Sequence, residues 1–418
     1  MNVLLLGGGG REHALAWKIA QSPRLTKLWI APGSAGMAGL GECVALDPMD
    51  GAAVALFARD REIDLVVVGP EAPLAAGVAD AVEAAGVPCF GPGAMAARLE
   101  SSKSFTKEIA DACGCPTAAW ARFDALGPAA AHVRARGAPI VVKADGLAAG
   151  KGVTVAETVE QALTALAAIF AEHGAAVVVE EFMTGEEASL FALCDGRRAM
   201  VFGTAQDHKR AFDGDRGPNT GGMGAYSPAP VMTPEVTARA METIVEPVLA
   251  EMARRGWPYR GVLYAGLMIE DGRPRLVEFN ARFGDPETQA LMLRLDCDIL
   301  PLLAAAAAGD LSGERAVWSD DAAMTVVLAA KGYPGDHARG EAIGGVEDAA
   351  AVEGVTLFHS GVRREDGLWL SNGGRVLNVA ARGATLAQAR DRAYAAVDRI
   401  AWPGGFHRRD IGWRALKG

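Results

Sequence analysis

Residues 143–153 read KADGLAAGKGV, with an apolar PIVV before them and a strand-like VTVA from Val153 onwards. A Walker A loop, G-x-x-x-x-G-K-[ST], does not fit, because Asp145 replaces its first glycine and Gly152 its hydroxyl residue. A P-loop also runs into a helix, whereas a strand follows here. The segment is predicted to be a glycine-rich hairpin that closes over nucleotide phosphates, with Lys143 at the exit of its first strand. A surface turn without a ligand is the alternative.

The composition is typical of a folded protein with several domains. The chain has 418 residues, of which 50% are hydrophobic and 22% charged, so it can bury sizeable cores and has the length of about three domains. Its formal net charge is −10, whereas nucleic-acid binding depends on clustered lysine and arginine. We therefore expect no nucleic acid as a partner. Small phosphorylated ligands need only one cationic pocket and stay compatible with this charge.

No segment predicts secretion or a membrane span. The apolar run in MNVLLLGGGG is too short for a signal peptide, and ILPLLAAAAAG at 299–309 is interrupted by Pro301 and too short for a bilayer. The cysteines show no paired metal-ligand spacing beyond Cys113-x-Cys115, as expected of reduced thiols. We expect a cytoplasmic protein, and a monomer because no long heptad pattern demands an oligomer.

The first hundred residues alternate apolar runs with helical patterns. NVLLLG, KLWIAPG, DLVVVGP and PCFGPG read as strands separated by helices. This alternation predicts an α/β fold with a doubly wound parallel sheet over residues 1–100. Such sheets bind ligands beyond the carboxyl ends of their strands, which here are Gly7–Glu12, Pro32–Gly36 and Gly69–Glu71.

Beyond residue 100 the pattern changes to short strands with few helices. QDHKRAFDGDRGPNTGGMGAYSP at 206–228 reads as a long loop without regular structure, either functional, which its length favours, or a solvated Ω-loop. A helix is predicted over 234–256, followed by the strands GVLYAGLMI and PRLVEFNARFG. A final α/β unit begins near Met324. We expect domains at 1–100, 101–323 and 324–418.

The turn GGGGREHA does not meet the dinucleotide-binding fingerprint. Glu12 or His13 occupies the third small position of G-x-G-x-x-G/A, and the second strand ends in Pro32-Gly33 without a carboxylate for a ribose. Glycines before a helix N-terminus can still bind a phosphate or a sugar, and Arg11 can add a charge-assisted hydrogen bond. A tight strand-to-helix turn is the alternative.

Two further clusters carry polar groups at strand ends. After the apolar VVV, the segment Glu180–Met183 offers backbone groups to an adenine edge, and Glu187 offers a carboxylate to ribose; a solvated acidic strand end is the alternative. In RLVEFNARFGDPE, Glu278 and Asn280 share one face of a strand. Two hard oxygen ligands on one face suit Mg²⁺, although they could also line a wet sheet face.

Together these segments resemble an ATP-grasp ligase, and the resemblance extends along nearly the whole chain. GGGGREHA, VGPEAPLAAG, KADGLAAGKGV, QDHKRAFDGDRGPNTGGMGAYSP, EFNARFGDPETQ, KGYPG and GGRVLNV resemble, in order, the motifs of the phosphoribosylamine–glycine ligase family. The resemblance implies a doubly wound N-terminal domain, a two-part ATP-grasp core with a mobile lid at about 118–188, and a small C-terminal α/β domain. It also implies the second step of purine biosynthesis. In that step ATP, glycine and 5-phospho-β-D-ribosylamine give ADP, phosphate and glycinamide ribonucleotide through a glycyl phosphate.

The resemblance also implies roles for individual residues. The ATP ligands it implies are Lys103, Lys143, Gly146, Gly150, Lys151, Gly152, Glu180, Glu181, Met183 and Glu187. The acceptor and acyl-phosphate end would involve Asp213, Asn219 and Arg282, and Mg²⁺ or Mn²⁺ would be held by Glu278 and Asn280. Phosphoribosylamine would dock at Gly10, Arg11, Glu12, Gly33, Ser34 and Glu71. The strand before E-x-N has no carboxylate until Glu270, so the number of metal ions stays open, and FHSGV at 358–362 has no derivable role.

Two other functions compete with this one. A different ATP-grasp enzyme, such as a carboxylase, would release ADP with bicarbonate or another carboxylate and without glycine. A non-catalytic nucleotide-binding or NAD-linked protein would use the N-terminal glycines, but both failures of the fingerprint disfavour it.

Overall fold

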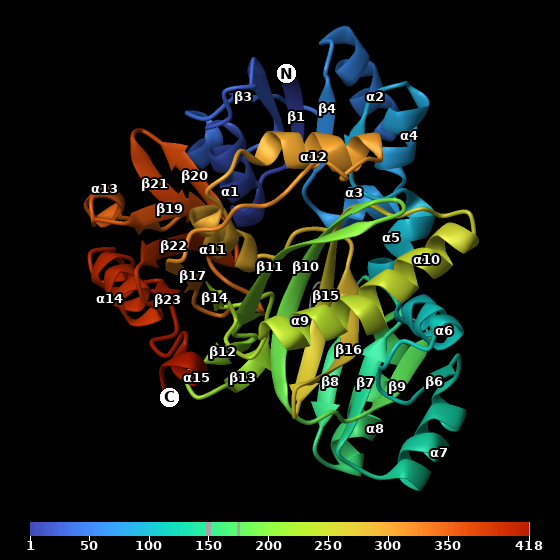
Figure 1. Ribbon diagram of the computed structural model, residues 1–418. Coiled ribbons are helices and arrows are strands. Elements are labelled where there is room, and N and C mark those ends of the chain that lie inside the picture. Colours follow the sequence, from blue (N-terminus) through green and yellow to red (C-terminus); the bar gives the residue numbers. More distant parts are fainter. Residues whose placement is uncertain (148–151, 174–175, 418) are drawn as a thin grey trace.

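The computed structural model describes residues 1–147, 152–173 and 176–417. Figure 1 shows the N-terminal strands at the top, a small four-stranded sheet at the lower right and the C-terminal elements at the left, all around a larger central sheet. This mixed α/β architecture confirms the predicted fold class.

The N-terminal region is a doubly wound parallel sheet, as predicted. Its strands lie in the order β3-β2-β1-β4-β5, and every pairing is parallel. Val3 and Leu5 of β1 pack into one core with α1, whereas Leu4 and Leu6 pack into another with α2 and α4, so both faces are covered. The elements are β1 (Asn2–Gly7), α1 (Gly10–Ile19), β2 (Lys27–Pro32), η1 (Ala35–Met37), β3 (Glu42–Cys43), α2 (Gly51–Asp60), β4 (Leu65–Val68), α3 (Glu71–Ala75), α4 (Val78–Ala84), β5 (Cys89–Phe90), α5 (Ala94–Ser101) and α6 (Lys103–Cys113).

A four-stranded antiparallel sheet, β6-β9-β7-β8, has its own apolar core with two helices. The glycine-rich hairpin is confirmed at its base, because Lys143 pairs with Val153 and Ala144 N donates to Gly152 O at 2.8 Å. Gly150 and Lys151, predicted at its tip, lie outside the described residues. The elements are β6 (Trp120–Phe123), α7 (Leu126–Arg136), β7 (Ile140–Ala144), β8 (Val153–Ala156), α8 (Val159–His173) and β9 (Val177–Glu181).

The large sheet runs β16-β15-β10-β11-β14-β17-β22-β19, with β23 against β17. The division expected at residue 324 falls inside β17, which pairs with β14. One sheet therefore continues from the central into the C-terminal region. Its strands are β10 (Glu186–Asp195), β11 (Ala199–Asp207), β14 (Gly224–Ser227), β15 (Arg260–Glu270), β16 (Arg273–Asn280), β17 (Ala322–Ala330), β19 (Val355–His359), β22 (Arg375–Gly383) and β23 (Gly405–Phe406).

The prediction of a structureless loop over 206–228 is wrong. β12 (Arg210–Phe212) and β13 (Arg216–Asn219) form a hairpin, and β14 is a buried strand between β11 and β17. The glycines and charges of this segment conceal its strands, because the strand that stabilises β14 is distant in sequence: Tyr226 pairs with Met324. Local composition does not report such pairings.

The helix predicted over 234–256 is one helical run with a wide turn in its middle. α9 (Pro234–Ala240) passes through a π-helical turn, η2 (Met241–Val245), into α10 (Glu246–Arg254). The wide turn directly precedes Pro247 of α10, whose missing N–H already interrupts the α-helical hydrogen bonds. The remaining elements are α11 (Glu287–Arg294), α12 (Ile299–Ala308), β18 (Ala342–Ile343), α13 (Val346–Ala350), β20 (Val362–Glu365), β21 (Leu368–Ser371), α14 (Leu386–Val397) and α15 (Trp413–Leu416).

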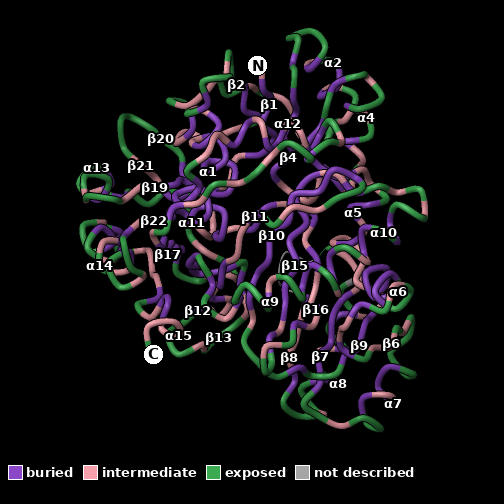
Figure 2. Tube along the Cα trace, viewed as in Figure 1, coloured by how far each residue is buried: buried purple, intermediate pink, exposed green. Residues whose placement is uncertain are grey.

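A shared core joins the N-terminal sheet to the large sheet. Leu4 and Val66 belong to the same apolar cluster as Leu190 and Leu263, and Figure 2 shows buried chain through the centre of the molecule and exposed chain at its rim. Burial of apolar surface stabilises this junction by about 25 cal/mol per Å². None of the helices in the described ranges combines the length and the apolar character that a membrane crossing needs.

Candidate active site

A cavity of about 910 Å³ lies where the N-terminal region, the β7–β8 hairpin, the large sheet and the C-terminal region meet. Residues predicted for ATP, metal and acceptor share this one space. The predicted residues that line it are Arg11, Glu71, Lys103, Lys143, Gly146, Gly152, Glu180, Asn219, Glu278, Asn280 and Arg282.

Where the ATP ligands are predicted, one buried carboxylate orients two lysines. Glu180 Oε1 lies 2.9 Å from Lys143 Nζ, and its Oε2 lies 3.0 Å from Lys107 Nζ. All three side chains are at most 5% exposed, and burial lowers the pKa of Lys107. Glu180 therefore positions Lys143, and each of its oxygens lies within ion-pair distance of a lysine.

Lys103, at the first turn of α6, is the third lysine in this part of the cavity. It donates to Gly146 O at 2.8 Å, which ties the base of the hairpin to α6. Burial lowers the pKa of Lys103, and Lys143 adds to the effect, although Glu278 opposes it. Two lysines near one another on a cavity wall are suited to phosphate oxygens.

Of the segment predicted at the adenine end, Glu180 lines the cavity, whereas Glu181 and Met183 do not. Glu181 N donates to Ala119 O at 2.9 Å, and its carboxylate pairs with Arg275, which lowers the pKa of Glu181. Met183 is buried. Contacts of Glu181 and Met183 with adenine stay predictions.

Glu278 and Asn280 both border the cavity from β16. Burial alone would raise the pKa of the Glu278 carboxyl, but Lys209, Lys143 and Lys103 lower it below its usual range. An ionised carboxylate and an amide oxygen are hard donors that fit Mg²⁺. Within the described residues, no group of three or more His, Cys, Asp and Glu side chains could hold a metal by itself. The pair therefore fits an ion that takes its other ligands from phosphate and water.

Lys209 was missed by the sequence analysis. Its ammonium pairs with Glu187 and lies 4.0 Å from Glu278 Oε1. Burial opposes its charge, but Glu187 and Asp207 raise the pKa of Lys209 well above its usual range. Burial, together with Glu287 and Glu187, raises the pKa of Asp207 to about 7. Glu187, predicted at the ribose, thus meets a lysine, and no local pattern in the sequence shows this pairing.

Arg282 stands between the metal pair and the N-terminal sheet. Its Nη2 lies 3.1 Å from Glu100 Oε1, and its Nε lies 3.4 Å from Glu71 Oε2. Burial alone would lower the pKa of Arg282, but Glu100 and Glu71 raise it. Arg11 Nη1 lies 3.9 Å from the same Glu71 and donates to Phe283 O at 3.2 Å. These contacts fix the position of the Arg282 guanidinium in the cavity lining.

The glycine-rich turn after β1 packs against protein atoms. A Cβ at Gly7 would lie 2.5 Å from Glu12 Cγ, and one at Gly8 would lie 2.5 Å from Gly33 O. Glu12 is 2% exposed, accepts from Gly9 N at 2.8 Å and pairs with Arg11. Glu12, predicted to bind substrate, is thus part of the turn and does not line the cavity. A role of Glu12 in substrate binding stays a prediction.

Three further predicted substrate ligands also lie outside the cavity lining. A Cβ at Gly10 would lie 2.4 Å from Ser360 Oγ. Gly33 has φ of +72°, and a Cβ there would lie 2.6 Å from Cys43 Sγ. Ser34 Oγ is buried without a hydrogen-bond partner in the described part of the chain.

Asp213 and Asn219, predicted together, lie at different ends of the β12–β13 hairpin. Asn219 lines the cavity, whereas Asp213 accepts from Arg409 N at 2.8 Å and borders a separate surface hollow. The fully buried Arg408 holds the hairpin turn through Asp215 at 2.8 Å. The C-terminal tail therefore anchors the hairpin that carries Asn219.

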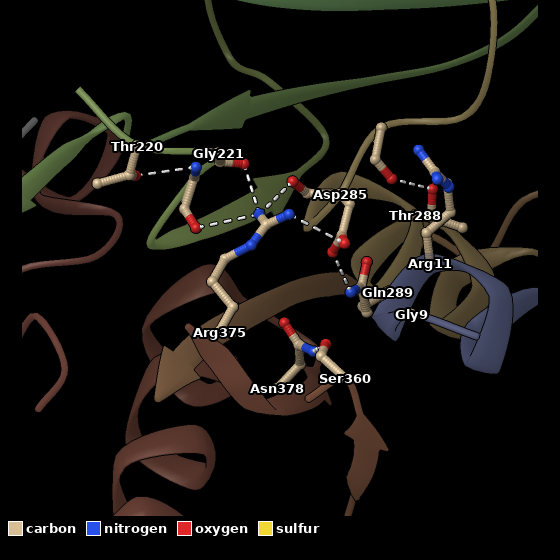
Figure 3. A network of polar contacts seen from close by, with 12 residues as sticks. Gly9, Arg11, Thr220, Gly221, Asp285, Thr288, Gln289, Ser360, Arg375 and Asn378 are labelled. Carbon is tan, nitrogen blue, oxygen red and sulfur yellow. Dashed lines mark hydrogen bonds and ion pairs between the residues drawn. The ribbon is translucent and has the colours of Figure 1, made fainter. Parts of the chain in front are cut away.

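Arg375 at the start of β22 was also missed. Figure 3 shows its guanidinium pointing at Gly221 and Asp285, with Asn378 and Ser360 below it. Its Nη1 donates to Asp285 O at 2.6 Å, and its Nη2 lies 3.1 Å from Asp285 Oδ2. Ser360 belongs to FHSGV. This segment therefore packs between the N-terminal turn and the C-terminal region. The motif GGRVLNV contains Arg375, but only the fold brings it to the cavity.

The hairpin-bearing small sheet, the large sheet with its E-x-N strand and the cavity between them define an ATP-grasp protein. Biotin carboxylase from Campylobacter jejuni shares this fold, with a TM-score of 0.74 at 14% identity over 100% of this chain and 95% of that one. Family models of phosphoribosylglycinamide synthetase match residues 1–100 (N domain), 101–288 (ATP-grasp domain) and 323–414 (C domain).

Two relatives carry the assignment further. A phosphoribosylamine–glycine ligase from Mesorhizobium japonicum is 60% identical over 100% of this chain and 99% of its own length. The crystal structure of phosphoribosylamine–glycine ligase from Thermotoga maritima has a TM-score of 0.84 at 31% identity, covering 99% of this chain and 100% of that one. The chain belongs to the phosphoribosylamine–glycine ligase family, which confirms the resemblance seen in its motifs.

Proposed function

We propose that this protein uses ATP to join glycine to 5-phospho-β-D-ribosylamine through a glycyl phosphate. The products are N1-(5-phospho-β-D-ribosyl)glycinamide, ADP and phosphate, the second step of purine biosynthesis. Family membership along the whole chain supports the reaction. The observation that carries it is a single cavity lined together by Lys103, Lys143, Glu278, Asn280 and Arg282.

The chemistry needs charge control and positioning. A carboxylate is a poor electrophile, so the γ-phosphoryl group is first transferred to glycine; the ribosylamine nitrogen then attacks the acyl carbon and phosphate leaves. Lys103 and Lys143 bind the ATP phosphates, and Arg282 orients the glycine carboxylate and stabilises the charge that develops during transfer. Glu278 and Asn280 would hold Mg²⁺ or Mn²⁺, which neutralises phosphate charge when bound. No enzyme nucleophile is required.

We also propose that the domains 1–100, 101–323 and 324–418 act in a cytoplasmic monomer that binds no nucleic acid, and that 118–188 moves as a lid. The hairpin of that segment rests on the Lys103–Gly146 hydrogen bond. Nucleotide binding is then expected to slow amide exchange in 118–188.

The decisive experiment measures ADP formation with phosphoribosylamine generated in situ, with and without glycine. ADP release is expected only when both small substrates are present. Release that ignores either of them, or that depends on bicarbonate, would contradict the proposed function and favour another ATP-grasp reaction.

A further inference from the structure

The arginines that line the cavity differ in how their charge is balanced. In the described part of the lining, each arginine except Arg339 has a carboxylate partner; the pairs are Arg11 with Glu12, Arg282 with Glu100 and Arg375 with Asp285. The guanidinium of Arg339 has no carboxylate, hydrogen-bond or ring partner among the described residues. A phosphate needs a cation whose charge is not already neutralised.

His337 lines the same wall, two residues before Arg339. Its Nδ1 lies 2.9 Å from Gly335 O, so Nδ1 carries a proton. Its Nε2 is buried and, among the described residues, has no hydrogen-bond partner. A buried ring nitrogen without a partner is unfavourable unless a ligand satisfies it.

The segment that carries both side chains is held in shape by its neighbours. Tyr333 and His337 stand edge to face, with ring centroids 6.5 Å apart, and Tyr333 OH accepts from Gly221 N at 3.1 Å. Both rings lie over Gly374, where a Cβ would come within 2.4 Å of Tyr333 and 3.3 Å of His337. The position next to Arg375 must therefore be glycine for this wall to form.

We propose that residues 333–339 form the subsite for the 5-phosphate of the ribosylamine. Arg339 binds two phosphate oxygens in a fork, and His337 Nε2 shares a single proton with a third, since a phosphate monoester has a second pKa near 6. Asp336 also lines the cavity, and its carboxylate has no hydrogen-bond or ion-pair partner in the described chain. It can accept a hydrogen bond from a ribose hydroxyl. The inference rests on the proposed function and names where its acceptor is held.

The N-terminal strand ends are less suited to the phosphate. The side-chain charge of Arg11 is balanced by Glu12, and the space beside Gly7, Gly8 and Gly10 is filled by protein atoms. In this arrangement the N-terminal region faces the ribose and the amine of the substrate, while the C-terminal region binds its 5-phosphate.

The test compares Arg339→Ala with Arg390→Ala, a matched control on the outer helix α14 whose arginine pairs with Asp391. Ribose 5-phosphate, a stable mimic that lacks the amine, is titrated by calorimetry, and steady-state kinetics are measured for all three substrates. Arg339→Ala is expected to lower the affinity for ribose 5-phosphate and to raise the KM for phosphoribosylamine, each by about 10–100-fold. The KM values for ATP and glycine are expected to change less than about twofold. Arg339→Lys should restore part of the loss, and His337→Asn should give a smaller one.

The outcomes separate this inference from the proposed function. If the wild type shows ADP release that needs glycine and phosphoribosylamine but Arg339→Ala binds ribose 5-phosphate normally, the subsite is wrong and the function stands. If all three KM values rise together in Arg339→Ala, the residue acts on the fold of the cavity, and the subsite is again wrong. If the wild type shows no such ADP release, the proposed function fails, whatever ribose 5-phosphate does.

Discussion

The nucleotide side and the acceptor side of the cavity treat positive charge differently. On the nucleotide side, Lys107 and Lys143 share one carboxylate, Glu180, and Lys103 donates to the backbone oxygen of Gly146. On the acceptor side, each arginine of the described lining except Arg339 is matched with a carboxylate of the described chain. Excess positive charge suits a triphosphate, which brings several negative charges with it. Arginines that are paired with carboxylates instead orient a small substrate, and Arg339 binds the phosphate of that substrate.

The largest effect is expected where the two sides meet, at Glu278. Glu278→Gln removes the charge that fits the metal ion, so we expect kcat to fall by at least about 10³-fold. The side chain borders the cavity, so the midpoint of thermal unfolding should shift by only a few degrees. ADP release and calorimetry measure the two quantities. Glu270→Gln is the control, because that carboxylate bonds to Thr184 outside the cavity. A Glu278→Gln enzyme with near-normal kcat would remove this residue from the reaction.

The second prediction concerns the ion pairs of the nucleotide side. Glu180→Gln leaves two buried lysines without a counter-charge, and we expect the free energy of unfolding in urea to fall by about 3 kcal/mol, with a raised KM for ATP. The neighbouring Glu181→Gln is the matched control, because its pair with Arg275 lies at the surface. That change should cost less than about 1 kcal/mol. Equal losses of unfolding free energy in the two variants would show that Glu180 stabilises the fold no more than a surface carboxylate does.

The third prediction concerns the acceptor side. Arg282→Lys keeps the charge but loses the fork that meets Glu100 and Glu71, so we expect kcat to fall by about 10–100-fold with little change in the KM for ATP. Arg275→Lys at the surface is the control. Should the KM for ATP rise as much as kcat falls, Arg282 would belong to the nucleotide side.

The smallest effect is a pH dependence of stability at the contact between His13 of the N-terminal region and His359 of the C-terminal region. His359 N donates to His13 Nδ1 at 2.9 Å, and the two rings stack with centroids 5.3 Å apart. Burial lowers the pKa of His13 to about 3 and that of His359 to about 4; His359 adds to the first shift, while Glu347 and Arg364 act in opposite directions on the second. Since both folded pKa values lie below the unfolded value near 6.5, protons bind the unfolded chain more tightly.

Stability from this pair is therefore complete above about pH 6.5 and is lost as the pH falls toward 4 and then 3. We expect the free energy of unfolding to fall between pH 6.5 and 4.5, and His359→Gln to reduce that slope. Urea titrations at several pH values measure it. Affinity for ribose 5-phosphate should decline before affinity for ATP does. A slope unchanged by His359→Gln would mean that other groups carry the acid sensitivity.

Strands and helices with strong local patterns were predictable. The alternation of apolar runs before residue 100 predicts the parallel sheet, and the failed Walker A match at 143–153 predicts the hairpin, because both depend on neighbouring residues. The strand β14 was not predictable, since its partner β17 lies far along the chain. Lys209, Arg375 and Arg339 were missed for the same reason: a lone basic residue carries no local signal of the acid or cavity that it faces.

Motif spacing and hydrophobic periodicity are local properties of the chain, and they were sufficient to predict the family, most of the strands and helices and the residues suited to phosphate and metal. Which charges are paired with one another follows from the folded arrangement and not from any local pattern. Glu12 caps its own helix, Glu180 pairs with two lysines, and Arg339 lines the cavity with no carboxylate partner among the described residues. Electrostatic balance depends on distances of a few ångströms between residues remote in sequence, and folding alone sets those distances.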